Sequence, residues 1–278
     1  MKVILWGTRG SLPSAGPETV RYGGNTACVE VRGNDGSVLV LDAGTGIRRL
    51  GMALGEEISR VDILLSHLHM DHIQGLGFFQ PLYETGRDVH IWGPASATLG
   101  LRERLGRYLS PPLFPVRMRD LPSHPELHDV PRERFRVGDF EVCADLLLHP
   151  GPTVGYRIEQ DGRSVAYLSD HEPALGTGAL PPEREWTSGF DLAEGVDLLL
   201  HDAQYSDTEY DEHAGWGHSS ISQALAFADA VGAGRLVTFH HDPTHDDDLL
   251  DRLTDEALRA HRPSFEVVAG AEGASFEP

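Results

Sequence analysis

The chain has 278 residues, a formal net charge of -20 at pH 7, 40% hydrophobic residues and 24% charged residues. This composition is ordinary for a globular protein and excludes a disordered or membrane one, and the length suits a single domain spanning residues 1–278. The strong acidity gives no electrostatic support for a protein that coats long nucleic acids.

The N-terminal apolar stretch, Val3 to Trp6, is too short for the core of a signal peptide, and no run approaches a transmembrane length. We therefore expect a cytoplasmic protein without a membrane partner. Cys28 and Cys143 each lie in an apolar, strand-like run, and we expect both to be reduced core residues. The sequence leaves the oligomeric state open, a homodimer included.

The first half of the chain contains apolar runs bounded by glycine, asparagine and aspartate, a pattern typical of strands. These strands are expected at 3–6, 27–32, 37–41, 61–65 and 88–92. Helices are expected at 47–54 and from about Ile73. The third strand ends in Asp42-Ala43-Gly44, which is an ordinary strand exit when taken alone.

The most informative stretch is His67-Leu68-His69-Met70-Asp71-His72, which follows a strand expected to be buried. Three imidazoles and one carboxylate in six residues supply the ligand atoms that zinc and related divalent ions take. In an extended segment His67 and His69 point the same way, whereas Asp71 and His72 lie further round. The pattern predicts two bound metal ions, and the alternative interpretation is a solvated, histidine-rich turn.

From residue 94 to residue 131 the chain becomes rich in proline and arginine. We expect a helix near 96–109 and then an irregular excursion. Its arginines, at positions 102, 104, 107, 117 and 119, form the densest positive charge of an acidic protein. They are interpreted either as a solvated helix face or as guanidinium groups that would suit a phosphate.

The second half of the chain contains strands that end in histidine or aspartate. Strands are expected at 140–148, 165–168, 196–200, 235–239 and 265–268. The first four are followed by His149, Asp170, His201-Asp202 and His240, respectively. Helices are expected at 220–231, where an apolar stripe would face a sheet, and at 247–261.

Two halves of interleaved strands and helices, each with ligands at strand ends, predict two β-sheets packed face to face with helices outside. The motif at 67–72 resembles the signature of the metallo-β-lactamase-fold hydrolases, and Asp42-Ala43-Gly44 resembles their Asp-x-Gly turn. The resemblance covers the chain from Gly7 to Gly273. It implies an α/β protein, built as an αββα sandwich of two mixed β-sheets with helices on the outer faces.

The resemblance also implies a complete dinuclear ligand set. One ion would be held by His67, His69 and His149 and the other by Asp71, His72 and His240, with Asp170 bridging the two. The two divalent ions, zinc or alternatively manganese or iron, would activate a shared water. Taken alone, His149 and His240 are each compatible with a core or surface histidine.

Asp170 indicates the branch of the superfamily, because phosphodiesterases, thioesterases and lactonases of this fold carry an aspartate there and true β-lactamases do not. Gly217-His218-Ser219 resembles an element of ribonuclease Z and related phosphodiesterases, in which the histidine stabilises the phosphate and protonates the leaving oxygen. Asp202 stands where those enzymes keep an orienting carboxylate. The candidate catalytic residues are therefore His218, Asp202 and Asp71, and the alternative for His218 is a simple neighbour of a helix cap.

The sequence thus predicts a dinuclear metal-dependent hydrolase of a small phosphodiester, such as a cyclic nucleotide or a short nucleotide ester. Residues 7–11 and 22–26 resemble the opening elements of bacterial cyclic-nucleotide phosphodiesterase-like proteins. A long nucleic acid is not expected, since the sequence shows no glycine- and proline-rich arm with a basic tip. The alternatives are a thioesterase or lactonase, RNA processing like that of ribonuclease Z, and a non-catalytic metal-binding sensor.

Overall fold

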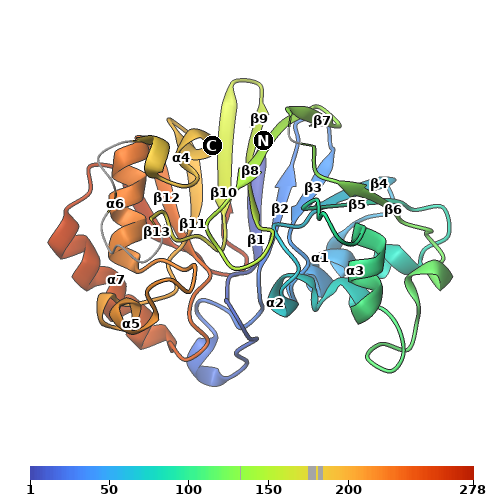
Figure 1. The fold of residues 1–278 in the computed structure, drawn as a ribbon, viewed down its shortest axis with the longest axis horizontal. Coiled ribbons are helices and arrows are strands. Elements are labelled where there is room, and N and C mark those ends of the chain that lie inside the picture. The colour runs from blue at the N-terminus through green and yellow to red at the C-terminus, as the bar shows by residue number, and fades with distance from the viewer. Residues whose placement is uncertain (132, 175–179, 181–183) are drawn as a thin grey trace.

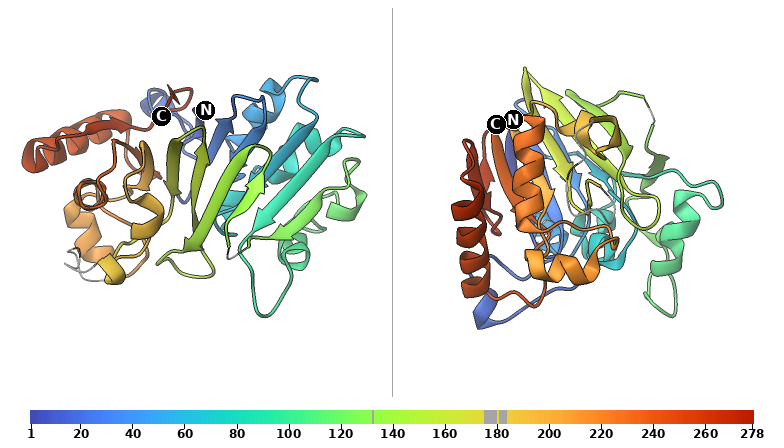
Figure 2. Two further views of the ribbon diagram at one scale, coloured as in Figure 1. Left: turned by 90° about the horizontal axis from the view of Figure 1, so that it is seen from above. Right: turned by 60° about the vertical axis from the view of Figure 1, so that its left-hand side comes forward.

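The computed structural model describes residues 1–131, 133–174, 180 and 184–278. Their strands form two seven-stranded sheets that face each other, and helices lie on both outer sides (Figures 1 and 2). This arrangement confirms the predicted αββα sandwich of two mixed sheets. None of the helices in these parts of the chain combines the length and the apolar character needed to cross a bilayer.

The first sheet contains the strands of the N-terminal half and the last strand. In order across the sheet they are β14 (Ser275–Phe276), β1 (Lys2–Gly7), β2 (Cys28–Arg32), β3 (Val38–Leu41), β4 (Arg60–Leu64), β5 (Asp88–Gly93) and β6 (Glu126–Asp129). Pairing is antiparallel from β14 to β3 and parallel from β3 to β6. The carboxyl ends of β3 and β4 therefore meet at one edge of the sheet, where Asp42 and the histidine motif lie.

The second sheet repeats this division. In order across the sheet its strands are β13 (Glu266–Ala269), β12 (Arg235–Phe239), β11 (Leu198–Asp202), β10 (Arg163–Leu168), β9 (Val154–Gln160), β8 (Phe140–Leu146) and β7 (Phe135–Val137). Pairing is parallel from β13 to β10 and antiparallel from β10 to β7. The carboxyl ends of three parallel neighbours thus bring Asp170, Asp202 and His240 to the same edge.

Helices cover the outer face of each sheet. Those in the first half are α1 (Ile47–Ala53), α2 (Met70–Ile73) and α3 (Leu101–Tyr108), with the 3-10 helices η1 (Pro17–Thr19), η2 (Leu76–Phe78), η3 (Gln80–Tyr83) and η4 (Met118–Asp120). Those in the second half are η5 (Arg184–Trp186), α4 (Phe190–Ala193), α5 (Asp207–His213), α6 (Ile221–Val231) and α7 (Asp247–His261). Apolar residues of α1 and α3 pack on the first sheet, and those of α4 and α6 pack on the second.

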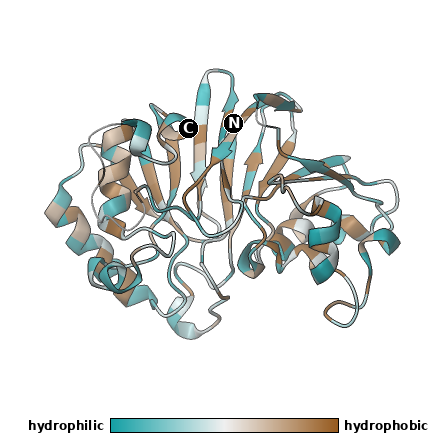
Figure 3. Ribbon diagram, viewed as in Figure 1, coloured by the Kyte–Doolittle hydropathy of each residue, from teal (hydrophilic) through white to brown (hydrophobic). Residues whose placement is uncertain are grey.

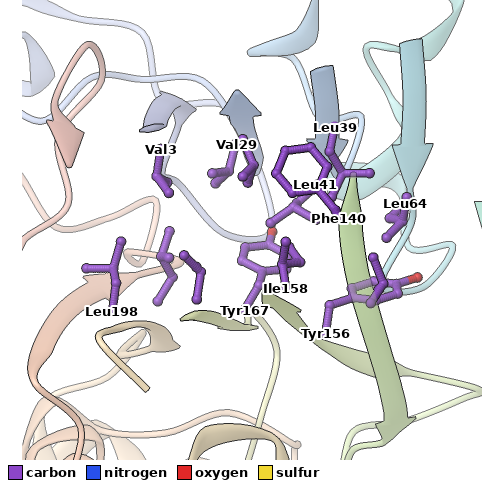
Figure 4. Packing of buried hydrophobic residues seen from close by; sticks show 14 of the residues in the cluster. Val3, Val29, Leu39, Leu41, Leu64, Phe140, Tyr156, Ile158, Tyr167 and Leu198 are labelled. Carbon is purple, nitrogen blue, oxygen red and sulfur yellow. The ribbon is translucent and has the colours of Figure 1, made fainter. Parts of the chain in front are cut away.

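Strand β3 shows why these sequences form central strands. Leu39 and Leu41 point into the core between the sheets, whereas Val38 and Val40 point outward into the helix layer, and all four side chains are buried. A strand covered on both faces must be apolar throughout. The same alternation on the facing strands fills the space between the sheets (Figure 4), and hydrophobic strands run through the centre of the molecule (Figure 3).

Two core tyrosines tie this packing to the edge that carries the ligands. The hydroxyl of Tyr156 donates to the carbonyl of Leu65 at 2.6 Å, and that of Tyr167 donates to Oδ2 of Asp42 at 2.8 Å. Both tyrosine side chains are fully buried, so each hydroxyl needs such a partner. The core therefore fixes the ends of β3 and β4, which precede the histidine motif.

Some sequence-based boundaries are wrong. The helix expected at 96–109 spans only Leu101–Tyr108, because Gly100 is its N-terminal cap. The excursion that follows does not stay irregular, since it returns as strand β6. Strand β8 ends at Leu146 rather than Leu148. Cys143 is only partly buried rather than in the core, because β8 lies next to the edge strand β7 and Cys143 packs only against the margin of the apolar cluster that contains α4 and α6.

Candidate metal centre

The histidine motif spans the turn from β4 into α2. His69 is still extended, with φ -67° and ψ 154°, and α2 begins at Met70 and carries Asp71 and His72. The change from extended to helical backbone therefore divides the motif, with His67 and His69 on one side of the turn and Asp71 and His72 on the other. This placement agrees with the division expected from the sequence.

The first of two clusters joins His67 and His69 with His149 and Asp170, whose potential ligand atoms all lie within 4.8 Å of one another. Nε2 of His149 lies 3.1 Å from Nδ1 of His69 and 3.7 Å from Oδ2 of Asp170. Burial lowers the pKa of His67, His69 and His149 below the ordinary value, well below it for His67. The rings are therefore neutral at neutral pH and have lone pairs free for a cation.

The second cluster joins Asp71, His72, Asp170 and His240. Nε2 of His72 lies 3.2 Å from Oδ2 of Asp71 and 3.3 Å from Nε2 of His240. Nε2 of His240 lies 3.1 Å from the same Asp71 oxygen. That oxygen also accepts a hydrogen bond from the backbone N–H of Ser11 at 2.8 Å, so the N-terminal glycine-rich loop helps to position Asp71.

Asp170 lies between the two clusters and offers one oxygen to each. Its Oδ1 is 3.0 Å from Nε2 of His72 and 3.3 Å from Nε2 of His240, whereas its Oδ2 is 3.7 Å from Nε2 of His67. Burial alone would raise the pKa of this carboxyl group, but the three imidazoles hold it well below its usual range. An ionised carboxylate with this orientation is suited to bridging two cations.

A buried aspartate supports the motif from behind. Asp42 accepts hydrogen bonds from the backbone N–H of Ser66 at 2.7 Å and from its hydroxyl at 2.8 Å, and Nδ1 of His72 lies 2.8 Å from Oδ2. The Ser66 hydroxyl oxygen lies 3.0 Å from Nδ1 of His67. Partners at Nδ1 fix both rings with Nε2 turned toward the clusters.

His240 is held in an unusual backbone conformation. Its φ is 60°, in the left-handed region that side chains other than glycine rarely adopt. Gly10 permits the close approach of the ring, since a Cβ there would lie 2.3 Å from Nδ1 of His240. Oε1 of Gln204 lies 2.9 Å from the same nitrogen and accepts a hydrogen bond from its N–H, which leaves Nε2 unprotonated and facing the second cluster.

The loop that carries His218 is fastened beneath the first cluster. Nδ1 of His149 donates to the carbonyl of Gly217 at 2.9 Å. The fully buried Glu172 accepts from the backbone N–H of Gly215 at 3.0 Å and of Gly217 at 2.9 Å. Gly217 has φ 86°, and a Cβ there would lie 2.8 Å from His149 Nδ1. Glycine is therefore required for this close approach.

His218 and Asp202 form a hydrogen-bonded pair beside the clusters. Nδ1 of His218 lies 2.7 Å from Oδ2 of Asp202, and the His218 ring stacks on that of His240 with centroids 5.1 Å apart. Within the described residues Nε2 of His218 has no hydrogen bond. Burial opposes protonation, but the Asp202 carboxylate raises the pKa of His218 to about 9. The ring is therefore protonated on both nitrogens, and positively charged, at neutral pH in the metal-free protein.

The residues present fit a pair of divalent cations. Nε2 of His67 is buried without a hydrogen-bond partner, and Oδ1 of Asp170, although close to His72, makes no hydrogen bond of acceptable angle. Burying such atoms unpaired is costly. Burial opposes protonation of His72, yet Asp170, Asp71 and Asp42 raise its pKa well above the ordinary value, which indicates a surplus of negative charge. Cations would satisfy both features.

The structure brings together every predicted site residue, since the ligand candidates lie in the two clusters and His218 and Asp202 lie beside them. Sequence reasoning missed Gln204, Glu172 and Ser66, which position these residues through hydrogen bonds. The available signal was their position, because each lies one or two residues from a predicted site residue. The exposed Arg102 and Arg107 lie on α3, in agreement with a solvated helix face.

Comparison with known proteins gives a consistent result. A family model described as "Beta-lactamase superfamily domain" matches residues 38–241. A ribonuclease Z of Haloarcula marismortui is 26% identical over 98% of this chain and 95% of its own length.

Two solved structures share the fold. The metallo-beta-lactamase fold protein YhfI of Bacillus subtilis has a TM-score of 0.72 at 20% identity and covers 99% of both chains. The short form of human tRNase Z has a TM-score of 0.65 at 22% identity, covering 100% of this chain and 99% of its own. The chain therefore belongs to the beta-lactamase superfamily, in the branch of the metallo-β-lactamase fold that resembles ribonuclease Z.

Proposed function

We propose that this chain is a metal-dependent phosphodiesterase that hydrolyses a small phosphodiester, such as a cyclic nucleotide or a short nucleotide ester. The observation that carries the proposal is the His218–Asp202 pair, 2.7 Å apart, beside the two ligand clusters. A protonated imidazole at this position is suited to a reaction whose leaving group is a poor one, such as an alkoxide.

Two ions would be held by the predicted ligands. His67, His69 and His149 would bind one, Asp71, His72 and His240 would bind the other, and Asp170 would bind both. When bound, two divalent ions, zinc or alternatively manganese or iron, would lower the pKa of a shared water and neutralise the charge of the phosphate oxygens.

The remaining chemistry belongs to side chains of this chain. His218 would donate its Nε2 proton to the leaving oxygen, and Asp202, which accepts at Nδ1, would keep the ring charged and oriented. Asp71, whose Oδ2 is held by the Ser11 N–H, would orient the attacking water. These assignments give His218, Asp202 and Asp71 distinct roles at one site.

The leaving group separates this proposal from a thioesterase on the same centre, whereas a lactonase, which also releases an alkoxide, is separated by the substrate panel below. A thiolate departs readily without a proton, so a thioesterase has little use for an imidazolium fixed by a buried carboxylate. RNA is a stronger second candidate, because the similarity to a protein named ribonuclease Z extends over 98% of this chain. The net charge of -20 favours the small substrate, since long-range repulsion weakens binding of a polyanion.

The test is a substrate panel with the metal-loaded protein. Turnover of bis(p-nitrophenyl) phosphate, cyclic nucleotides, transfer RNA precursors, a thioester and a lactone is compared as kcat/KM at fixed ionic strength. We expect the phosphodiesters to be cleaved and the cyclic nucleotides to be preferred over the RNA. Preference for the RNA would identify the second candidate as the function. Full metal occupancy without turnover of any phosphodiester would contradict the proposal and favour a metal-binding sensor.

A further inference from the structure

A second group of histidines and carboxylates lies on β5 and β6, at the edge of the first sheet. In the parallel pairing of these strands His90 is opposite Glu126 and Trp92 is opposite His128. The four side chains therefore project from the same face of the sheet. None of them belongs to the two clusters described above.

Three potential ligand atoms converge in this group. Nδ1 of His90 lies 2.8 Å from Nε2 of His128, and Oε2 of Glu126 lies 3.8 Å from the first nitrogen and 3.9 Å from the second. His90 is only 7% exposed, whereas the side chains of His128 and Glu126 are 29% and 66% exposed. The group is thus anchored in the fold on one side and accessible to solvent on the other.

Neighbouring side chains hold both rings in position. His128 stacks on the indole of Trp92, with ring centroids 4.2 Å apart, and Nε1 of Trp92 donates to Oδ1 of Asp62 at 2.9 Å. Nε2 of His90 lies 2.9 Å from Oδ1 of Asp88, although the angle is too far from linear for a hydrogen bond. A carboxylate near that nitrogen favours a proton there and leaves the Nδ1 lone pair available to a metal.

The charge around the rings is unbalanced. Asp62, Asp88 and Glu126 surround them with negative charge, and Arg60 donates two hydrogen bonds of 2.8 and 2.9 Å to Asp62 and lies 4.0 Å from Asp88. Three carboxylates against one guanidinium leave an excess of two negative charges, which matches the charge of a dication. Two imidazole nitrogens and one carboxylate oxygen suit zinc and its neighbours in the first transition row, whereas magnesium and calcium prefer sites built from oxygen.

We propose that His90, His128 and Glu126 bind a transition-metal dication such as Zn²⁺ at a peripheral site, with water completing the coordination. The ion would fasten the edge strand β6 to β5 and so close the loop of residues 94–125 that joins the two strands. A cross-link that closes a long loop has the largest stabilising effect in the chain-entropy model.

The closed loop is in contact with the segment that directly follows the histidine motif. The hydroxyl of Tyr108, on α3, donates to the carbonyl of Gln74, which directly follows α2, at 2.6 Å. The phenyl ring of Phe114 packs edge-on against Phe78 at 5.6 Å. The peripheral ion would therefore stabilise a segment that buttresses α2, the helix that carries Asp71 and His72.

The test compares Zn²⁺ binding by the full chain and its variants. Protein stripped of metal with a chelator is dialysed against excess Zn²⁺, and the bound zinc is measured by inductively coupled plasma mass spectrometry. We expect His128→Gln and Glu126→Gln to bind one ion fewer per chain than the unmodified protein. Both changes are at solvent-accessible side chains, so the fold should survive. His261→Gln, near the end of α7, is the matched control that removes an imidazole elsewhere.

Two further measurements make the outcome decisive. Zn²⁺ should raise the Tm of the His261→Gln control more than that of His128→Gln, because only the control would retain the peripheral ion. Anomalous scattering at the zinc edge, from crystals grown with Zn²⁺, should show a peak within bonding distance of Nδ1 of His90 and Nε2 of His128. Equal stoichiometry in all variants, with no such peak, would reduce the group to a hydrogen bond between two histidines and overturn the proposal.

Discussion

Gln204 and His240 form a hydrogen bond in which Oε1 of Gln204 lies 2.9 Å from Nδ1 of His240. Gln204 follows β11 and His240 follows β12, so the bond joins the ends of two neighbouring parallel strands. It fixes the ring of a residue whose backbone has φ 60°. A side chain absent from the predicted ligand set thus decides the direction in which Nε2 of His240 points.

Replacing Gln204 should therefore weaken metal binding without unfolding the protein. Gln204→Met keeps the volume of the side chain and removes the acceptor, and loss of such a partner typically lowers metal affinity about 10- to 100-fold. Gln204→Glu retains an acceptor at the same position and should hold metal better than Gln204→Met, although it replaces the amide that faces Oδ2 of Asp242 at 3.5 Å with a second carboxylate. The measurement is metal retention in a chelator titration. Unchanged retention in Gln204→Met would show that the ring is fixed by other contacts.

His218→Ala should keep both ions and lose rate. General acid catalysis typically contributes about 100- to 10,000-fold, so kcat should fall within that range while KM changes little. The loss should be smaller for a p-nitrophenyl ester than for a nucleotide ester, because p-nitrophenolate departs without a proton. Steady-state kinetics on both esters, with metal analysis of the variant, provide the check. Loss of a metal ion would instead make His218 a ligand.

Asp202→Asn should follow the same pattern more weakly. The change removes the charge that favours the protonated form of His218 but leaves the ring in place. The larger loss should again fall on the ester with the poorer leaving group. If the variant lost the same factor on both esters, Asp202 would be acting on the fold of the site rather than on the proton of His218.

Asp170→Ala should release both ions, because one carboxylate faces both clusters. Metal content per chain after gel filtration in metal-free buffer gives the answer directly. Asp229→Ala is the matched control, since Asp229 is exposed on α6 and belongs to neither cluster. A variant that lost one ion and kept the other would show that Asp170 is a ligand of one site only.

The buried His201 should make the protein sensitive to acid. Burial lowers the pKa of His201 to about 4. Nδ1 of the neutral ring lies 2.7 Å from the carbonyl oxygen of Asp202, and its Nε2 lies 2.9 Å from Nδ1 of His171. In the unfolded chain this histidine takes up its proton near pH 6.5, so above that pH protonation of His201 does not lower the free energy of unfolding. The free energy of unfolding should fall by about 3 kcal/mol between pH 6.5 and 4.

Urea unfolding of the metal-free protein at a series of pH values measures this dependence without a contribution from ion release. His201→Gln, which cannot take up the proton, should be less stable at pH 7.5 but should lose stability less steeply between pH 6.5 and 4. Equal slopes for the two proteins would assign the acid sensitivity to other groups.

Much of the architecture could be predicted because burial dictates it. The apolar run that becomes β3 is covered on both faces, and the strands that end in Asp170 and His240 were recognisable from the same pattern. Strand β9 was missed because Val154–Gln160 contains glycine, arginine and glutamate, which weaken the apolar signal. Its place is set by pairing on both sides with β8 and β10, which is a tertiary effect.

The site was predicted from residue types that have few other uses together, as in His67-Leu68-His69-Met70-Asp71-His72. Gln204 and Glu172 could not be found in this way, since glutamine and glutamate are common in every context and act here only through neighbours distant in sequence. A single domain over residues 1–278 and homodimerisation stay predictions, because both depend on contacts that local sequence does not encode.

The residues of the two clusters come from both sheets, with the motif at 67–72 following β4 of the first and Asp170 and His240 following β10 and β12 of the second. An ion bound by residues from both sheets would therefore cross-link the sandwich, and its binding free energy would stabilise the packing of one sheet on the other. Chains synthesised under metal starvation would therefore open locally at this edge more often. Amide hydrogen exchange should be faster in β4 and β12 together, before any loss of secondary structure is detected.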